Sequence, residues 1–284
     1  MTRQSVKSTG AFAGLRQRAL TAIYYGPVSL LAIYLGPYST LALLLMLAFF
    51  TGREFEAITN LGKKHSKHLL NSFLGWLCFA GLLVPSILFL LAPDGLAVAS
   101  FICAGFLYIL WLNIRLMKAL PIFSGQNRIL SSLGYIAIPL SLFYWIGLHQ
   151  AMFNYKWLFA LLSLIWGNDT IAYFSGKNWG RRPLASSISP NKTWEGAIGG
   201  WLACIIIALV WSLYWDALNT TEWLVFGALT GSACTLGDLI ESKFKRELNL
   251  KDSGTSFPGH GGFLDRLDSL LFSAPIIAFY LWMV

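Results

Sequence analysis

From Ala19 to Phe50 the chain carries no charged residue. A helix needs about 20 apolar residues to cross the hydrocarbon core of a bilayer, so this stretch is too long for a single crossing. Gly36 and Pro37 lie near its middle, and both residue types interrupt helices. The stretch therefore predicts a helical hairpin made of two membrane spans, 19–35 and 37–51.

The composition of the whole chain points the same way. Hydrophobic residues make up 56% of the 284 residues and charged residues only 12%, whereas a soluble domain has about 25% charged residues. So few charges cannot cover the surface of a soluble globule of this size. The composition also excludes intrinsic disorder, a collagen helix and a disulfide-rich scaffold. An integral membrane protein remains.

Further apolar runs follow the first hairpin. Together with it they predict nine membrane spans, at 19–35, 37–51, 69–91, 96–112, 129–148, 157–175, 194–215, 223–240 and 267–284. Backbone groups inside lipid must satisfy their own hydrogen bonds, and these runs lack the alternation of a membrane β-barrel. We therefore expect an all-α polytopic membrane protein.

The basic residues give this topology an orientation. If the nine spans are correct, all of the 21 Lys and Arg residues except Lys156 fall on one side of the membrane. Basic loops stay in the cytoplasm, so the N-terminus is expected in the cytoplasm and the C-terminus outside. We divide the chain into an N-terminal transmembrane region of four helices (1–128) and a second transmembrane region of five (129–284). The second region has two long cytoplasmic loops, 176–193 and 242–266, and any catalytic chemistry is expected there.

Carboxylates gather around the second of these loops. Asp238, Glu241 and Lys245 are spaced to share one helix face, and Asp265 and Asp268 repeat the three-residue spacing after the loop. Carboxylates at the edge of a bilayer are unfavourable unless they are paired or bind a metal. Oxygen ligands of this kind suit a hard cation, most simply Mg²⁺. The alternative is a set of interfacial salt bridges with Arg246 and Arg266.

The loop between these carboxylates is rich in glycine. Gly254, Gly259, Gly261 and Gly262 allow the backbone to approach a ligand closely. Exposed amides in such a loop can bind an anion, although a flexible turn has the same composition. Because Lys251 and His260 also lie in this loop, we favour phosphate binding.

The other cytoplasmic loop predicts a second anion site. Ser189 followed by Pro190 is typical of a helix N-cap and first helical position, so we expect the helix of the 194–215 span to begin there. A helix N-terminus beside Lys192 would attract an anion. Arg181 and Arg182 fit ligand binding and contact with anionic lipid headgroups equally well.

Three stretches together resemble a known family. They are Asp169-Thr170-x-Ala172-Tyr173, then Ser189-Pro190-x-Lys192-Thr193-Trp194-Glu195-Gly196, and finally Gly237-Asp238-Leu239-x-Glu241-Ser242-x-x-Lys245-Arg246 continuing through Lys251-Asp252-x-Gly254-x-x-Phe257-Pro258-Gly259-His260-Gly261-Gly262-x-x-Asp265-Arg266-x-Asp268. The chain resembles the phosphatidate cytidylyltransferases, also called CDP-diacylglycerol synthases. The motifs cover roughly residues 166–268, and the N-terminal spans resemble the family in layout only.

The resemblance implies an Mg²⁺-dependent nucleotidyltransferase of phospholipid biosynthesis. Its substrates would be CTP and phosphatidate, and its products CDP-diacylglycerol and pyrophosphate. It implies a homodimer in the inner (cytoplasmic) membrane, with the site facing the cytoplasm and without a nucleic-acid partner. On this basis we assign Asp238, Asp265, Asp268 and Glu241 as metal ligands. We assign Lys192, Lys245, Arg246, Lys251 and Arg266 to phosphate groups, and His260 to the triphosphate or the leaving group.

Two other functions are compatible with such a chain. A CTP-dependent lipid kinase would transfer the γ-phosphoryl group to a lipid alcohol instead. An anion or lipid transporter would need no reaction, but transporters usually bind near the membrane midplane, on broken helices of inverted repeats. Here the polar residues gather at one face and no repeat is visible, which favours an enzyme.

Overall fold

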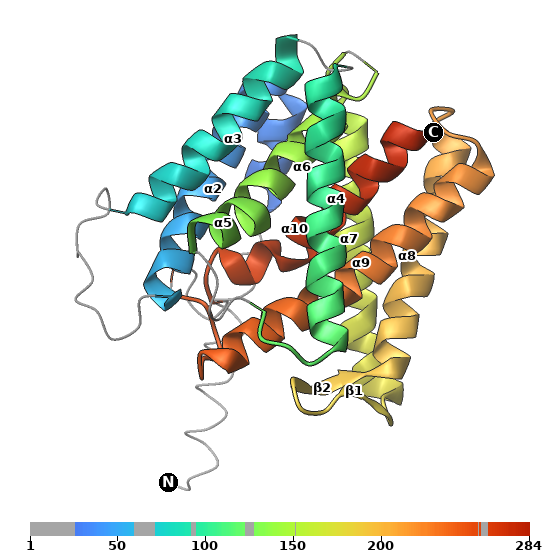
Figure 1. Cartoon of the computed structure of the whole chain (residues 1–284). Coiled ribbons are helices and arrows are strands. Elements are labelled where there is room, and N and C mark those ends of the chain that lie inside the picture. Colours follow the sequence, from blue (N-terminus) through green and yellow to red (C-terminus); the bar gives the residue numbers. More distant parts are fainter. Residues whose placement is uncertain are drawn as a thin grey trace, which may run out of the picture.

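The computed structural model describes residues 26–59, 72–91, 95–122, 128–150, 152–254, 256 and 261–284. These residues form a bundle of long helices with one short β hairpin (Figure 1). The elements are α2 (Pro37–Thr59), α3 (Phe73–Leu91), α4 (Leu96–Met117), α5 (Arg128–Ser132), the π-helix η2 (Leu133–Ala137), α6 (Ile138–Leu148), α7 (Tyr155–Trp179), β1 (Pro183–Ala185), β2 (Ser189–Thr193), α8 (Trp194–Tyr214), α9 (Thr220–Glu247) and α10 (Leu264–Met283).

The helical hairpin predicted at Gly36 and Pro37 is confirmed. Residues 26–34 are helical, and α2 begins at Pro37. Gly36 turns the chain between them with a φ of 121°, a value that glycine adopts without a steric penalty. The Ser39 hydroxyl donates to the Ala32 carbonyl at 2.6 Å and closes the turn.

Each predicted span that falls on described residues coincides with a helix. Among the described residues, six helices are long and apolar enough to cross a membrane: α3, α4, the continuous helix 128–148, α8, α9 and α10. The protein is therefore an all-α, multi-pass membrane protein. Helices α2 and α7 occupy predicted spans but lie outside this set. The first span, 19–35, lies only partly within the described residues.

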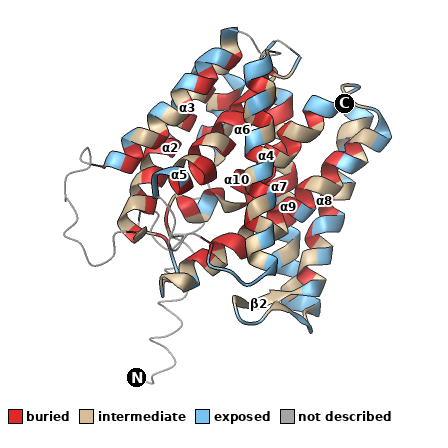
Figure 2. Ribbon diagram, in the orientation of Figure 1, coloured by how far each residue is buried: buried red, intermediate tan, exposed pale blue. Residues whose placement is uncertain are grey.

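Helices α6 and α10 form the centre of the bundle. Figure 2 shows buried residues along both, while α3, α4 and α8 carry exposed faces. Helix α10 packs against α9, α6 and α4, and 12 of its 20 residues are buried. Exposed apolar side chains such as Leu202, Ile206 and Leu213 on α8 are suited to contact with lipid.

Helices α7 and α8 approach each other closely along small residues. A Cβ atom on Gly200 of α8 would lie 2.6 Å from Asn168 Oδ1 and 2.9 Å from the Asn168 carbonyl oxygen on α7. Small residues that let helix backbones touch are typical of membrane helix pairs. This contact fixes the position of α8, which follows directly after the β hairpin.

The expectation that this helix begins at Ser189 is wrong. Residues 189–193 form β2, which pairs antiparallel with β1, and α8 begins at Trp194. A residue that precedes proline is pushed towards extended backbone, and this favours a strand at Ser189. Thr193 is the N-cap instead, because its hydroxyl accepts a hydrogen bond from the Gly196 amide at 3.2 Å.

Candidate metal and phosphate site

Three carboxylates converge where α9 faces α10. One oxygen atom from each of Asp238, Glu241 and Asp268 lies within 4.8 Å of the others. Asp238 and Glu241 are one turn apart on α9, and Asp268 comes from the first turns of α10. The three-residue spacing on α9 therefore places both side chains on the face that meets α10.

Glu241 is the most deeply buried member of this carboxylate group. Its side chain is 1% exposed, and its Oε1 atom has no hydrogen-bond donor among the described residues. A buried carboxylate oxygen without a partner is unfavourable. A hard divalent cation between the three carboxylates would satisfy it, so the residues present fit Mg²⁺.

Lys245 lies beside this group. It follows Glu241 by one turn of α9, and its Nζ atom is 2.7 Å from Glu241 Oε2 and 2.8 Å from Asp265 Oδ1. The ammonium is only 12% exposed and is held between two carboxylates from different helices. Lys245 thus links α9 to the start of α10.

Asp265, in the first turn of α10, binds the loop that precedes this helix. Its Oδ2 atom accepts hydrogen bonds from the amides of Ser253 at 2.9 Å and Gly262 at 2.8 Å. Within the described part of the chain it is not a member of the three-carboxylate group. Its assignment as a metal ligand stays a prediction.

Lys192 reaches the site from the β hairpin. It forms an ion pair with Asp238, and its Nζ atom lies 3.4 Å from Ser242 Oγ on α9. The hairpin folds back from the end of α7, and this brings a lysine far away in the sequence to the α9 carboxylates. The side chain of Lys192 is a quarter exposed, so it can also meet a ligand from outside.

The remaining predicted cations lie further out. Arg246 donates to the Leu250 carbonyl at 2.8 Å and to the Ile188 carbonyl at 3.4 Å, which connects the end of α9 to the β hairpin. Lys251 and Arg266 are exposed. His260 lies outside the described residues, as does much of the glycine-rich loop around it. For Arg181 and Arg182 the structure shows backbone contacts, because both amides donate to Glu195 Oε2.

Two acidic residues near the site were not among the predicted site residues. Glu54 of α2 is buried and binds the segment that leads into α10. Burial raises the pKa of its carboxyl group above the usual value, and the Ser256 and Leu264 hydrogen bonds oppose that rise. Asp169 of α7 lines a small cavity of about 70 Å³ together with Arg266. One feature of the sequence pointed to Glu54: it is a carboxylate shortly after the predicted span 37–51.

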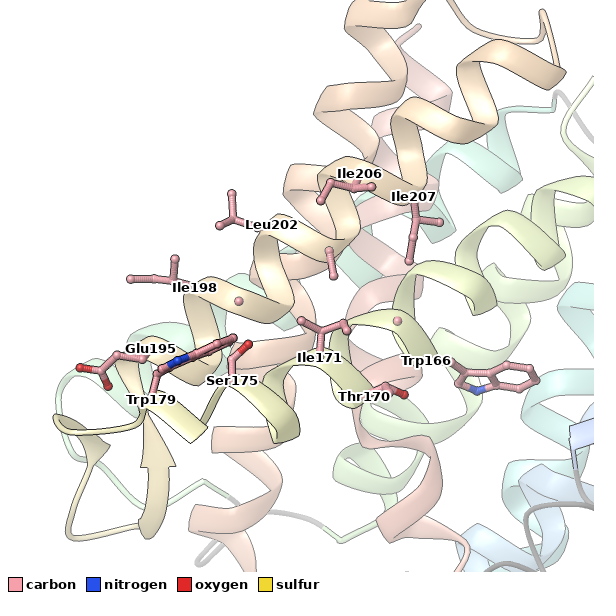
Figure 3. A pocket seen from close by; sticks show the side chains of 13 residues that line it. Trp166, Thr170, Ile171, Ser175, Trp179, Glu195, Ile198, Leu202, Ile206 and Ile207 are labelled. Atoms are coloured by element: carbon pink, nitrogen blue, oxygen red, sulfur yellow. The ribbon is translucent and has the colours of Figure 1, made fainter. Parts of the chain in front are cut away.

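A separate groove of about 920 Å³ runs along α7 and α8. In Figure 3, Ile198, Leu202 and Ile206 line it from α8, and Glu195 lies at one end. Its lining is almost entirely apolar. Of the described residues that line it, none belongs to the carboxylate group.

The fold and this site define a polytopic helical membrane protein with a carboxylate-rich centre between α9 and α10, beside which Lys192 and Lys245 lie. A sequence profile of the cytidylyltransferase family matches residues 16–284. The chain therefore belongs to the cytidylyltransferase family.

Individual relatives agree with this assignment. The chain is 41% identical to the phosphatidate cytidylyltransferase of Haemophilus influenzae over 145 residues, which are 48% of this chain and 50% of that protein. It is 42% identical to the phosphatidate cytidylyltransferase of Staphylococcus aureus over 153 residues, or 52% of this chain and 56% of that protein. It is also 42% identical over 121 residues to the uncharacterized protein YnbB of Escherichia coli, covering 43% of this chain and 41% of that protein. The chain thus matches about half the length of these relatives.

Proposed function

We propose that the protein is a phosphatidate cytidylyltransferase, which joins CTP to phosphatidate and releases CDP-diacylglycerol and pyrophosphate. The observation that carries this proposal is the group of Asp238, Glu241 and Asp268 with Lys192 and Lys245 beside it. Carboxylates and lysines together suit a reaction between two polyanions. Membership of the cytidylyltransferase family and the names of two relatives support the same reaction.

The reaction requires one bond to form and one to break. A phosphate oxygen of phosphatidate attacks the α-phosphorus of CTP, and the bond from that phosphorus to the oxygen bridging the α- and β-phosphorus breaks. Pyrophosphate leaves with the electron pair. The attacking phosphate is already an anion near neutral pH, because its second pKa is about 6, so no strong general base is needed. The barrier comes from repulsion between anions and from charge on the leaving group.

The proposed residues act by position and charge. Asp238, Glu241, Asp268 and Asp265 would hold Mg²⁺, which supplies charge neutralisation at the phosphates when bound. Lys192, which pairs with Asp238, and Lys245, which pairs with Glu241, would contact phosphate oxygens. Arg246, Lys251, Arg266 and His260 would bind the outer phosphates. Charges fixed in this way stabilise the transition state without reorganisation.

We also propose how the protein sits in the cell. Nine spans would place the N-terminus, the β hairpin and the carboxylate group at the cytoplasmic face of the inner membrane and the C-terminus outside. Phosphatidate would then enter from the bilayer and CTP from the cytoplasm, with no nucleic acid involved. We expect the protein to work as a homodimer.

The decisive experiment follows the label of CTP. The purified protein is incubated with phosphatidate, Mg²⁺ and CTP labelled either on the α- or on the γ-phosphate. We expect α-label in the lipid and γ-label in pyrophosphate. Transfer of the γ-label to lipid with release of CDP would identify a lipid kinase, and no transfer of either label would refute both reactions. A CTP analogue with a non-hydrolysable β,γ bridge should still be a substrate.

A further inference from the structure

Glu54 connects the N-terminal half of the chain to the proposed site. It lies on α2, and both oxygens of its carboxylate accept hydrogen bonds from the segment before α10. Ser256 Oγ donates to Oε1 at 2.5 Å, and the Leu264 amide donates to Oε2 at 3.1 Å. Ser253 Oγ lies 3.5 Å from the same Oε2 atom. The side chain is only 8% exposed, so these donors replace the water that burial removes.

The segment is shaped to surround this carboxylate. A Cβ atom on Gly254 would lie 2.8 Å from Glu54 Oε1, and a Cβ on Gly262 would collide with Oε2. Any other residue at either position would force the Glu54 carboxylate or the backbone of the segment to move. Beside the carboxylate, Phe50 of α2 stacks on Phe263 with ring centroids 5.1 Å apart, and this apolar contact joins the same two elements.

The backbone that Glu54 binds also holds Asp265. Ser253 offers its hydroxyl to Glu54 and its amide to Asp265, and Gly262 packs against Glu54 while its amide donates to Asp265. The other oxygen of Asp265 pairs with Lys245, which pairs in turn with Glu241. A continuous chain of contacts therefore runs from α2 to the carboxylate group.

We propose that Glu54 is a positioning residue for the proposed reaction: it fixes the residues on both sides of the glycine-rich loop so that Asp265 and Lys245 are held in place. The expected effect of Glu54 on turnover rests on the proposed function. The expected effect of Glu54 on the conformation of the loop does not depend on that function. All of the partners of Glu54 donate to it, and a carboxylate can accept from all of them. An amide keeps only one acceptor oxygen, so its NH₂ group would face either the Leu264 amide or a serine hydroxyl that would have to stop donating.

Glu56 provides a matched control on the same helix. Its Oε2 atom accepts hydrogen bonds from Ser72 Oγ at 2.5 Å and from the Leu74 amide at 3.1 Å. These partners, a serine hydroxyl and a leucine amide, are of the same kind as those of Glu54. They lie at the start of α3, away from the carboxylate group. Glu54→Gln and Glu56→Gln therefore remove the same chemistry at two different places.

Two measurements on the full-length protein test the inference. In hydrogen–deuterium exchange, Glu54→Gln should speed exchange in peptides that span residues 250–266, and Glu56→Gln should do so only around residues 72–76. In the labelled-CTP assay, Glu54→Gln should lower kcat about 10- to 100-fold, the usual scale for a residue that supports a ligand shell. Because the lost contacts matter most in the transition state, kcat should fall more than KM rises. Glu56→Gln should keep the wild-type kcat.

A second variant guards against a folding defect. Ser256→Ala removes one of the donors and leaves the carboxylate in place. It should speed exchange in the same peptides by a smaller factor, and adding it to Glu54→Gln should change little, because both remove one interaction.

The outcomes separate the two claims. Unchanged exchange at residues 250–266 in Glu54→Gln, or a wild-type kcat in that variant, would overturn the positioning role. Equal losses of kcat in Glu54→Gln and Glu56→Gln would also overturn it, since they would mean a general loss of structure. Faster loop exchange in Glu54→Gln, with a wild-type protein that does not transfer the α-label, would support the loop contact and refute the proposed function alone.

Discussion

The lysines of the site are held by carboxylates from other elements. Lys192 of β2 pairs with Asp238 of α9, and Lys245 of α9 pairs with Asp265 of α10. A partly buried ammonium that is fixed in this way loses little further side-chain entropy when it binds a phosphate. Under the proposed function, these ion pairs would hold the cations ready for the transition state, and they contribute little stability by themselves.

Asp238→Asn tests the carboxylate group directly. The substitution keeps the shape of the side chain but removes the charge that Lys192 and a bound cation would share. We expect turnover to fall by roughly 100-fold or more, the scale of losing one preorganised electrostatic contact. The measurement is α-label transfer over a range of Mg²⁺ concentrations. Asp216→Asn, between α8 and α9, is the matched control and should keep full activity. Near-normal activity of Asp238→Asn would contradict the metal assignment.

Lys192→Ala tests the contact from the hairpin. Loss of one charged phosphate contact that tightens in the transition state should cost about 2–4 kcal/mol, or about 30- to 1,000-fold in kcat. Lys177→Ala is the control. Lys177 lies in the last turn of α7, and its ammonium group lies over the ring of Tyr173. Steady-state kinetics with both substrates measure the effect. A variant in which KM alone rises would show that Lys192 binds the ground state and the transition state equally.

At the scale of elements, the contact between α7 and α8 positions the hairpin that carries Lys192. The backbone of α8 at Gly200 touches the backbone of α7 at Asn168, and the space there cannot accept a methyl group without movement. The hairpin spans the ends of these two helices (Figure 1). A displacement of α8 would therefore also move Lys192 relative to α9.

Gly200→Ala should destabilise the protein by about 1–3 kcal/mol, the usual cost of overpacking a tight contact. The substitution should also lower activity, because it moves the hairpin. Gly26→Ala is the matched control: its Cβ would meet nothing closer than Trp166 at 3.9 Å. The midpoint of thermal unfolding in detergent measures both variants. If Gly200→Ala unfolds at the wild-type temperature, the helices are not in close contact at this point.

At the scale of the whole molecule, the β hairpin lies at one end of the bundle and the C-terminus lies towards the opposite end (Figure 1). Lys192 of this hairpin pairs with Asp238 of the carboxylate group. The separation of the hairpin from the C-terminus agrees with the predicted topology, in which all Lys and Arg residues except Lys156 fall on one side of the membrane and the C-terminus on the other. Under the proposed function, a polyanionic nucleotide and a lipid headgroup would meet at the face of the membrane on the hairpin side.

A reporter fused after Val284 tests the orientation. A periplasmic phosphatase in that position should be active and a cytoplasmic fluorescent reporter dark, because the basic loops hold the other side in the cytoplasm. Fusions after residue 180, in the loop before β1, should give the reverse pattern. A cytoplasmic signal from the fusion after Val284 would show that the count of nine spans is wrong.

The sequence alone determined the class of fold and the approximate place of each helix. The length of an apolar run and the charge at its ends are local properties, and a bilayer selects on them directly. The spacing of Asp238, Glu241 and Lys245 was also local, and the structure brings these three side chains together along one face of α9. Their roles as metal and phosphate ligands stay a prediction.

Only the tertiary structure decided which distant groups meet these residues. Asp265 and Asp268 are three residues apart, like Asp238 and Glu241, and the sequence gives no reason to separate their roles. In the structure, Asp268 joins the carboxylates of α9, whereas Asp265 binds the backbone of the loop. The start of α8 was misplaced because a serine before a proline suits both a helix N-cap and an extended strand residue. The pairing of Ser189 with Ala185 decided for the strand, and the sequence does not show that pairing. Glu54 gave no sign of its partners, which lie about 200 residues further along the chain. Contacts of this kind depend on how the helices pack together, and hydropathy along a single chain carries no information about that packing.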